Sequence, residues 1–440
     1  MSQQTSRTPI RFVHASDLHL ERPLGGVSEV PGHLRELFLE APYLAAQQVF
    51  ETVLSEGADA LLLAGDVVDV ELAGPRAVLF LIEQFKRLAD HHIPVYWSGG
   101  HTDQTTEWPA HARLPENVTR FPTAHVESIS CQRDQEPIAC IQGISRGPNR
   151  PLQDRSPEDG TLDDSQFRRD AHGLFTVGVS YGTDVATGTE GDRVHYMALG
   201  GRHRRQTVDQ SPGLAHYCGT PQGRTPDESG PHGCTIVRVD ESGHVKTRFA
   251  ATDAVRWLTE TIEITAGTDA AGLLDQILQR TGRLSEKHAG PELLISWRIL
   301  GQGPLIYQLH PGGLADRLLE QVRQQQQQQG MKAWSVAIDC DAPLEVPAQW
   351  HDQETILGDL LRQIGQLETN PEIPLKLADF LPEALREIYG AESEHADGGL
   401  PETNPLAQLV TIENPLQRQT LLREAAKLGI DLITVEEPRS

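Results

Sequence analysis

Four short segments place carboxylate and imidazole side chains directly after an apolar run. They lie at residues 17–19, 65–69, 99–103 and 200–203. Carboxylate oxygen combined with imidazole nitrogen suits borderline divalent metals such as manganese, iron or zinc. One such pair is common by chance. Four of them in order, each behind an apolar run, predict a metal site.

The apolar runs have the length and boundaries of buried strands, and we expect them at residues 11–18, 60–70 and 93–100. Helical periodicity between them predicts amphipathic helices over 43–55 and 75–88. Alternation of strand and helix implies a parallel α/β sheet with right-handed crossovers. Ligands bind at the carboxyl edge of such a sheet, so the four polar segments are expected to meet there.

The next part of the chain is richer in strands. We expect a hairpin across 131–143, a long surface loop over 146–170, strands at 174–180 and 195–201, and a hairpin that turns at 241–243. The order strand, helix, strand, helix, strand then recurs between residues 256 and 344. Beyond it the chain reads as helical, and its last helix, expected at 414–428, packs on its own domain or on a partner.

Composition limits the class of protein. The chain has 440 residues, a formal net charge of −24 and five cysteines without CxxC spacing. We therefore expect neither a disulfide framework nor a zinc ribbon, but a reducing cytoplasm. No run predicts a membrane span, and no secretory signal is expected. The negative charge argues against non-specific coating of nucleic acid, although not against a local basic cleft. GxSxG and P-loop motifs are missing, which excludes a serine hydrolase of that type and a self-contained NTPase.

The sequences HASDLH, LAGDVVD, GGHTD, YMALGGRH and YCGTPQGRTPDESGPHG follow one another along the chain. They resemble the successive motifs of the calcineurin-like metallophosphoesterases, and within them the DNA-repair exonuclease branch of SbcD nuclease subunits and YhaO-type relatives. The resemblance extends over about residues 9–260. It implies an α/β fold, a four-layer sandwich of two mixed β-sheets flanked by helices, with a smaller α+β capping domain and a helical C-terminal region.

On this basis we expect three domains. They are a metallophosphoesterase domain at 9–254, a capping domain at 255–345 and a helical, partner-binding region at 346–440 with a linker at 390–400.

The family hydrolyses phosphodiesters with two cations about 3.5–4 Å apart. Asp17 and His19 match the pair that holds the first metal, and His203 matches another ligand of that metal. Asp66 matches the aspartate that bridges both metals. His101 matches the histidine that acts near the leaving group.

Three positions depart from the family pattern. Gly100, Tyr181 and Gly201 stand where the family carries an asparagine and two histidines that belong to the second metal alone. Glycine offers no donor, and neutral tyrosine is a poor ligand for these ions. We therefore expect one divalent cation, manganese, where the family has two, and weak or altered phosphodiesterase activity.

Basic residues cluster around the fourth segment. They are Arg168, Arg169, Arg202, Arg204, Arg205 and Arg224. Arg202, Arg204 and Arg205 are candidates for binding phosphate, and the alternative is a solvated charged edge. Arg202 either replaces the charge of the second cation beside Asp66 or points to solvent. Asp103 is a further candidate for a replacement ligand.

Three functions remain open. The first is a metal-dependent nuclease or phosphodiesterase acting on DNA. The second is a catalytically inactive scaffold that binds DNA or an ATPase partner, and the third is a phosphomonoesterase. The resemblance also implies a coiled-coil ATPase subunit as a partner and a homodimer.

Overall fold

The structure is a computed structural model. It describes residues 9–103, 108–109, 112–146, 167–182, 193–209, 213–301, 304–309, 313–340, 348–370, 375 and 415–434. The strands are β1 Ile10–Ala15, β2 Ala60–Ala64, β3 Val95–Ser98, β4 Val118–Arg120, β5 Glu127–Arg133, β6 Glu136–Ile144, β7 Phe175–Tyr181, β8 Tyr196–Gly200, β9 Gln206–Asp209, β10 Leu214–Tyr217, β11 Gly233–Val239, β12 Val245–Ala251, β13 Val255–Ile264, β14 Glu292–Gly301 and β15 Ala333–Cys340. The helices are η1 Gly32–Leu34, α1 Arg35–Ser55, α2 Val70–Asp90, α3 Ala270–Lys287, α4 Pro304–Gln308, α5 Leu314–Gln328, α6 Ala348–His351, α7 Ile356–Thr369 and α10 Pro415–Thr434.

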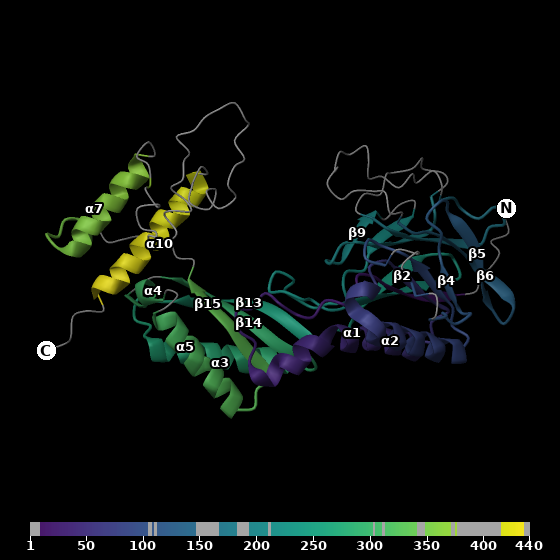
Figure 1. Ribbon diagram of the computed structural model, residues 1–440, viewed down its shortest axis with the longest axis horizontal. Helices are drawn as coiled ribbons and strands as arrows, with labels where there is room; N and C mark the ends of the chain where they lie inside the picture. The colour runs from purple at the N-terminus through teal and green to yellow at the C-terminus, as the bar shows by residue number, and fades with distance from the viewer. Residues whose placement is uncertain are drawn as a thin grey trace, which may run out of the picture. The chain divides into compact units, whose positions relative to one another are not determined.

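Two six-stranded sheets form the centre of the first part of the chain (Figure 1). The first has the order β12-β11-β1-β2-β3-β4, in which β1 to β4 are parallel to one another and β11 is antiparallel to both of its neighbours, β1 and β12. The second has the order β5-β6-β7-β8-β10-β9, with antiparallel strands at both edges. Both sheets are mixed, as predicted.

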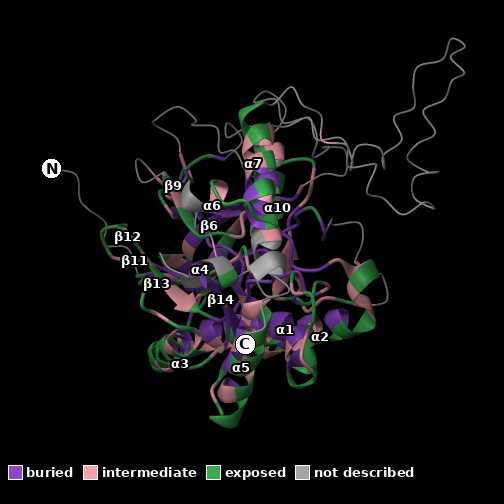
Figure 2. Cartoon of the chain, turned by 90° about the vertical axis from the view of Figure 1, so that its left-hand side faces the viewer, coloured by how far each residue is buried: buried purple, intermediate pink, exposed green. Residues whose placement is uncertain are grey.

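Apolar side chains fill the space between the two sheets. Phe12, Leu62 and Tyr96 of the first sheet share one buried cluster with Ile141 and Phe175 of the second. The opposite face of the first sheet is covered by α1 and α2, which lie side by side in Figure 1. Figure 2 shows both helices buried on part of their surface and exposed elsewhere, as an amphipathic covering helix should be. The prediction of two mixed sheets flanked by helices is confirmed.

Several boundaries differ from the expected ones. Helix α1 begins at Arg35 and continues through Pro42, well before the predicted start at residue 43. Helix α2 begins at Val70, where Asp69 caps it by accepting a hydrogen bond from the Leu72 N–H, and it kinks at Gly74. Strands β9 and β10 are short and lack a clear alternation, so the sequence did not reveal them. The predicted loop at 146–170 and linker at 390–400 lie largely or wholly outside the described residues.

The chain divides into two compact units. The first comprises residues 1–259, 281–296 and 329–336, and the second comprises 260–280, 297–328 and 337–440. Strands β13, β14 and β15 form a three-stranded sheet. In the second unit, α7 and α10 pack together through a cluster that includes Leu361, Ile364 and Leu422. The predicted domain limits at 254 and 345 stay predictions.

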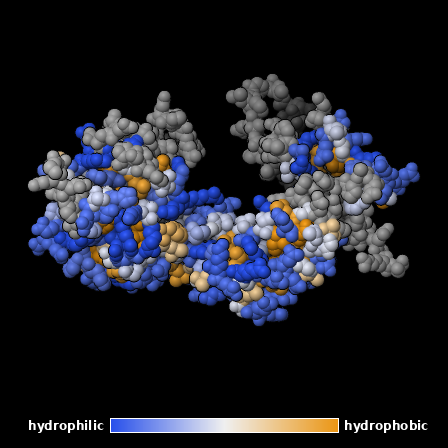
Figure 3. Space-filling model, turned by 180° about the vertical axis from the view of Figure 1, so that it is seen from behind, coloured by the Kyte–Doolittle hydropathy of each residue, from blue (hydrophilic) through white to orange (hydrophobic). Residues whose placement is uncertain are grey.

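The surface is mainly hydrophilic on the face drawn in Figure 3, with hydrophobic patches between. Among the described residues, no helix is both long and apolar enough to cross a membrane.

Two histidines are buried between the sheets, His14 on β1 and His216 on β10, with ring centroids 6.2 Å apart. His14 is hydrogen-bonded to the Tyr196 hydroxyl at 2.9 Å, and His216 to Thr207 and Thr235 at 3.0 Å. Burial lowers the pKa of both rings, and with the nearby charge of Arg205 it brings the pKa of His216 to about 4. The expectation that His14 is a core histidine is confirmed.

This burial makes stability depend on pH. Between pH 6.5 and about 4 the unfolded chain takes up a proton at His216 that the folded chain refuses, so stability falls as the pH falls. His216→Gln should remove up to about 1.4 kcal/mol per pH unit from that slope. Urea unfolding of both proteins across this range measures it, and equal slopes would contradict the assignment.

Candidate metal centre

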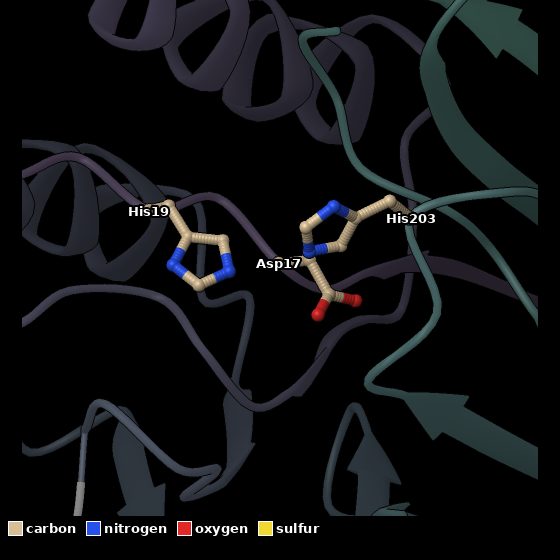
Figure 4. Close-up of side chains that lie close together, drawn as sticks. All are labelled: Asp17, His19 and His203. Atoms are coloured by element: carbon tan, nitrogen blue, oxygen red, sulfur yellow. The ribbon is translucent and has the colours of Figure 1, made fainter. Parts of the chain in front are cut away.

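Three predicted ligands meet at the carboxyl ends of the central strands. Single ligand atoms of Asp17, His19 and His203 all lie within 4.8 Å of one another. Asp17 and His19 follow β1, and His203 follows β8, so the centre joins the two sheets (Figure 4). The edge position predicted from the strand order is therefore observed.

The backbone at this edge is held in an unusual conformation. Asp17, His19 and Asp66 have φ angles of 54°, 44° and 52°. Hydrogen bonds between the two loops fix them, from Asp17 N–H to the Gly65 carbonyl at 2.9 Å and from His19 N–H to the Asp66 carbonyl at 3.1 Å. Left-handed backbone at non-glycine residues costs about 1–3 kcal/mol each and is concentrated at functional sites. This strain supports a functional edge.

Asp17 is fully buried. Its carboxylate accepts hydrogen bonds from the Ser16 hydroxyl at 2.5 Å and from the Gly201 N–H at 3.0 Å. Burial, and then the charge of Asp66, raise the pKa of Asp17. Two buried carboxylates that repel each other favour a cation between or beside them.

A glutamate orients each of the two imidazoles. Nδ1 of His19 is 2.9 Å from Oε1 of Glu21, which also accepts the Asp69 N–H through Oε2 at 3.0 Å. Burial opposes ionisation of Glu21, but these hydrogen bonds hold its pKa below the usual value. With Nδ1 occupied, Nε2 of His19 is buried 3.6 Å from Oδ2 of Asp66, and no described residue forms a hydrogen bond with it.

His203 repeats this arrangement. Its Nδ1 is hydrogen-bonded to Oε1 of Glu228, whose Oε2 accepts the Arg224 N–H at 2.6 Å. Although burial raises the pKa of Glu228, the hydrogen bonds from His203 and Arg224 bring it down to about 2. The Arg224 guanidinium is itself buried and lies 3.1–3.2 Å from both ring nitrogens of His203. Carboxylates that fix Nδ1 in this way are typical supports of metal-binding histidines.

Sequence reasoning missed both glutamates. Glu21 stands two residues after His19, and Glu228 lies within the segment YCGTPQGRTPDESGPHG. A search for carboxylates near the imidazole ligands would have found Glu21. Glu228 is 25 residues from His203, so only the folded chain brings them together.

Asp66 is buried beside this cluster and uses both of its oxygens. Oδ1 accepts the N–H groups of His101 at 2.6 Å and Thr102 at 2.8 Å. Oδ2 accepts the Tyr181 hydroxyl at 2.7 Å. Burial, and then the charge of Asp66, raise the pKa of Tyr181 far above its ordinary value, so this hydroxyl remains a neutral donor.

The Tyr181 ring fits against three glycines. A Cβ added to Gly65, Gly100 or Gly201 would lie 2.6, 2.9 or 3.2 Å from its ring carbons. At Gly100 the same Cβ would also lie 2.5 Å from both the N and the Oδ1 of Asp66. Residues 100 and 201 are thus limited to glycine while Tyr181 keeps this position.

Asp103 is part of the loop structure. It is buried and accepts hydrogen bonds from the N–H groups of Asp66, Val67 and Gly100 and from the Trp97 indole. Burial and the charge of Asp66 raise its pKa to about 6. A move toward a metal would leave these buried donors without an acceptor, which disfavours Asp103 as a replacement ligand.

The remaining candidates lie at the surface or are engaged locally. His101 contributes its backbone N–H to Asp66, while the residue itself is exposed. Arg202 donates to Gln206 at 2.7 Å and lies over the Tyr217 ring at 4.8 Å. Arg204 donates to the Asp227 carbonyl at 3.1 Å, and Arg205 lies 5.8 Å from the centroid of the Phe249 ring. Their predicted roles toward phosphate stay predictions.

The cluster fits a divalent cation. Among the described residues, Nε2 of His19 has no hydrogen-bond partner and faces a carboxylate oxygen, and a glutamate holds Nδ1 of each imidazole. Nε2 of His203 lies 3.2 Å from the Arg224 guanidinium. Two carboxylates with two imidazoles form a donor set suited to manganese, iron or zinc. Asp17, His19, Asp66 and His203 are the residues that would hold the ion.

Comparisons with known proteins agree with this site. Residues 10–169 match the family of calcineurin-like phosphoesterases. The uncharacterized metallophosphoesterase YhaO of Bacillus subtilis strain 168 is 26% identical over 405 residues, which are 87% of this chain and 95% of the relative.

Two solved structures are also similar. One is an archaeal phosphodiesterase, 11% identical, with a TM-score of 0.26, over 55% of this chain and 100% of that one. The other is a dimetal phosphatase from Danio rerio, 10% identical, with a TM-score of 0.33, over 55% of this chain and 98% of that one. At these TM-scores the two structures bear neither on the substrate nor on the site of this chain.

Residues 10–169 thus match the calcineurin-like phosphoesterases, and the chain is similar to YhaO over most of its length. The resemblance inferred from the sequence motifs is confirmed. Members of this superfamily use divalent metals to hydrolyse phosphoesters, which is the chemistry that the cluster of carboxylates and imidazoles suits.

Removing the charge of Glu228 tests how the centre is supported. Glu228→Gln keeps the size of the side chain but weakens its hold on Nδ1 of His203, so affinity for Mn²⁺ should fall by about 10- to 100-fold. Calorimetric titration measures it, and Glu241→Gln in an exposed turn is the matched control. An unchanged affinity in Glu228→Gln would show that Glu228 does not support the metal.

Proposed function

We propose that this protein is a phosphodiesterase acting on DNA with a single divalent cation, manganese. The observation that carries the proposal is the hydrogen bond from Tyr181 to Oδ2 of Asp66, formed in the space that Gly100 and Gly201 leave open. In the family, Asp66 matches the carboxylate that bridges two metals. Here Oδ1 accepts two backbone N–H groups and Oδ2 accepts a neutral hydroxyl, so both oxygens of this carboxylate are engaged before a second ion could bind.

A bound cation would polarise the phosphoryl group and activate a water molecule. The residues of the chain prepare this step. Glu21 and Glu228 hold Nδ1 of His19 and His203, which directs Nε2 of each ring toward the cation. Nε2 of His203 lies 3.2 Å from the Arg224 guanidinium, which a bound cation would displace. The N–H groups of His101 and Thr102 fix Asp66. The His101 side chain, which is exposed, is the proposed group that acts near the leaving oxygen.

The absence of a second cation has a chemical consequence. Two cations stabilise the attacking and the leaving oxygen together, whereas one cation stabilises only part of that charge. We therefore expect slower turnover than in a two-metal enzyme. Arg202, Arg204 and Arg205 are the proposed contacts to the phosphates of DNA.

The partners belong to the same proposal. Exposed leucines on α1 and α2 support a homodimer, since large exposed apolar groups often mark an interface; they are Leu39, Leu44, Leu72 and Leu79. The paired helices α7 and α10 are the proposed binding region for a coiled-coil ATPase, and Ile356 at the start of α7 is 76% exposed. All five cysteines are unpaired, which supports a reducing cytoplasm.

Hydrolysis of bis(p-nitrophenyl) phosphate in the presence of Mn²⁺ tests the activity. The wild-type rate should exceed that of Asp66→Ala by at least about 100-fold, because removal of Asp66 deprives the cation of a central ligand. Equal background rates in the two proteins would refute the enzyme and favour the inactive scaffold. A marked preference for p-nitrophenyl phosphate would favour a phosphomonoesterase.

A further inference from the structure

Three cations stand side by side across the first sheet, at the end opposite the metal centre. In the strand register, Arg11 of β1 is paired with Arg238 of β11, and Arg238 is paired with Lys246 of β12. Residues directly opposite each other share a face of the sheet, and like charges in such pairs are destabilising. The row therefore requires negative charge nearby.

The carboxylates of the protein supply only part of that charge. Glu56 is shared by Arg11, Arg238 and Arg248, and the hydrogen bond from Arg238 is the main cause that lowers its pKa. Asp59 is occupied by Arg133, which donates to both of its oxygens.

Positive charge is therefore left over at this end of the sheet. Lys246 is exposed, and no carboxylate of the described residues lies within salt-bridge distance of it. Five cations, Arg11, Arg133, Arg238, Lys246 and Arg248, face three carboxylates, Glu56, Asp59 and Asp240. The excess is positive in a chain whose net charge is −24.

A groove of about 440 Å³ opens over this row. Its charged and titratable lining residues are Arg11, Asp59, Arg133, Arg238, Asp240, His244 and Lys246. Pockets of about 300–1,000 Å³ hold small ligands. The lining is cationic and contains forked guanidinium groups, which suit the oxygens of phosphate.

We infer that this groove binds a compact phosphate-bearing anion, a di- or triphosphate compound. A groove of about 440 Å³ has room for a small anion, which would meet the local excess of positive charge. Glu56 and Asp59 engage the guanidinium groups of Arg11, Arg133 and Arg238, so Lys246, with Arg238 and His244, is the proposed contact.

This site is separate from the metal centre. Ile10 lines the groove and Ala15 ends β1 two residues before Asp17, which places the two sites about 20 Å apart at opposite ends of one strand. The inference goes beyond the proposed function and does not depend on it.

Calorimetric titration of the full chain with inorganic triphosphate, in EDTA so that the metal centre stays empty, tests the inference. The wild type should bind, and Lys246→Glu should weaken binding at least tenfold because attraction is replaced by repulsion. Lys246→Gln, which removes only the charge, should have an intermediate effect. Lys86→Glu on the exposed side of α2 is the matched control for the change in net charge and should bind as the wild type does.

Two further variants locate the anion. Arg204→Glu and Asp66→Ala alter the metal side and should leave triphosphate binding unchanged. Lack of binding by the wild type, or loss in Arg204→Glu but not in Lys246→Glu, would overturn the inference. Binding of a short DNA duplex that displaces triphosphate and is lost in Lys246→Glu would overturn the assignment to a compact anion. Failure of the phosphodiesterase assay would leave these results untouched.

Discussion

Asp66 uses its two carboxylate oxygens for different interactions, and the arrangement of the metal centre depends on this division. Oδ1 accepts backbone N–H groups of the loop after β3, which ties that loop to the end of β2. Oδ2 lies 3.6 Å from Nε2 of His19 and accepts the Tyr181 hydroxyl. Oδ1 therefore holds the loop after β3. Oδ2 binds the neutral Tyr181 hydroxyl and also faces the side where a cation would bind.

The charges around Asp66 favour the binding of a cation. Asp17 and Asp66 are buried, and burial together with their mutual repulsion raises the pKa of Asp17. Glu21 and Glu228 add negative charge behind the imidazoles, and the buried Arg224 offsets only part of it. A divalent cation among these groups would stabilise the folded edge as well as provide the chemistry. Structure and proposed function thus depend on the same electrostatic balance.

The sequence reveals the strands of the centre and the ligands behind them, because each ligand follows its strand directly. Asp17, His19 and His203 lie close together because the carboxyl ends of parallel strands meet at one edge of a sheet. The contact between Glu228 and His203 could not be predicted, because it depends on how two separate loops fold. The contacts of the Arg202 side chain with Gln206 and Tyr217 could not be predicted either, because they depend on side-chain packing and not on the spacing of residues along the sequence. The start of α1 was missed because Pro42 reads as a helix breaker, although it is tolerated inside this helix.

The role of Tyr181 could also be recognised only from the structure. In the sequence it is a lost ligand, since a tyrosine stands where the family has a histidine. In the folded protein its ring fills the space against Gly65, Gly100 and Gly201, and its hydroxyl binds Asp66. The Tyr181 ring and these glycines form one arrangement, because a Cβ at residue 65 or 100 would lie within 3 Å of the ring and one at residue 201 would lie 3.2 Å from it.

Anomalous diffraction from a crystal soaked in Mn²⁺ tests the central claim most directly. We expect one peak, bound by Asp17, His19, Asp66 and His203, with the Tyr181 hydroxyl still on Oδ2 of Asp66. A second peak on the other side of Asp66, with Tyr181 displaced, would contradict a single-cation centre.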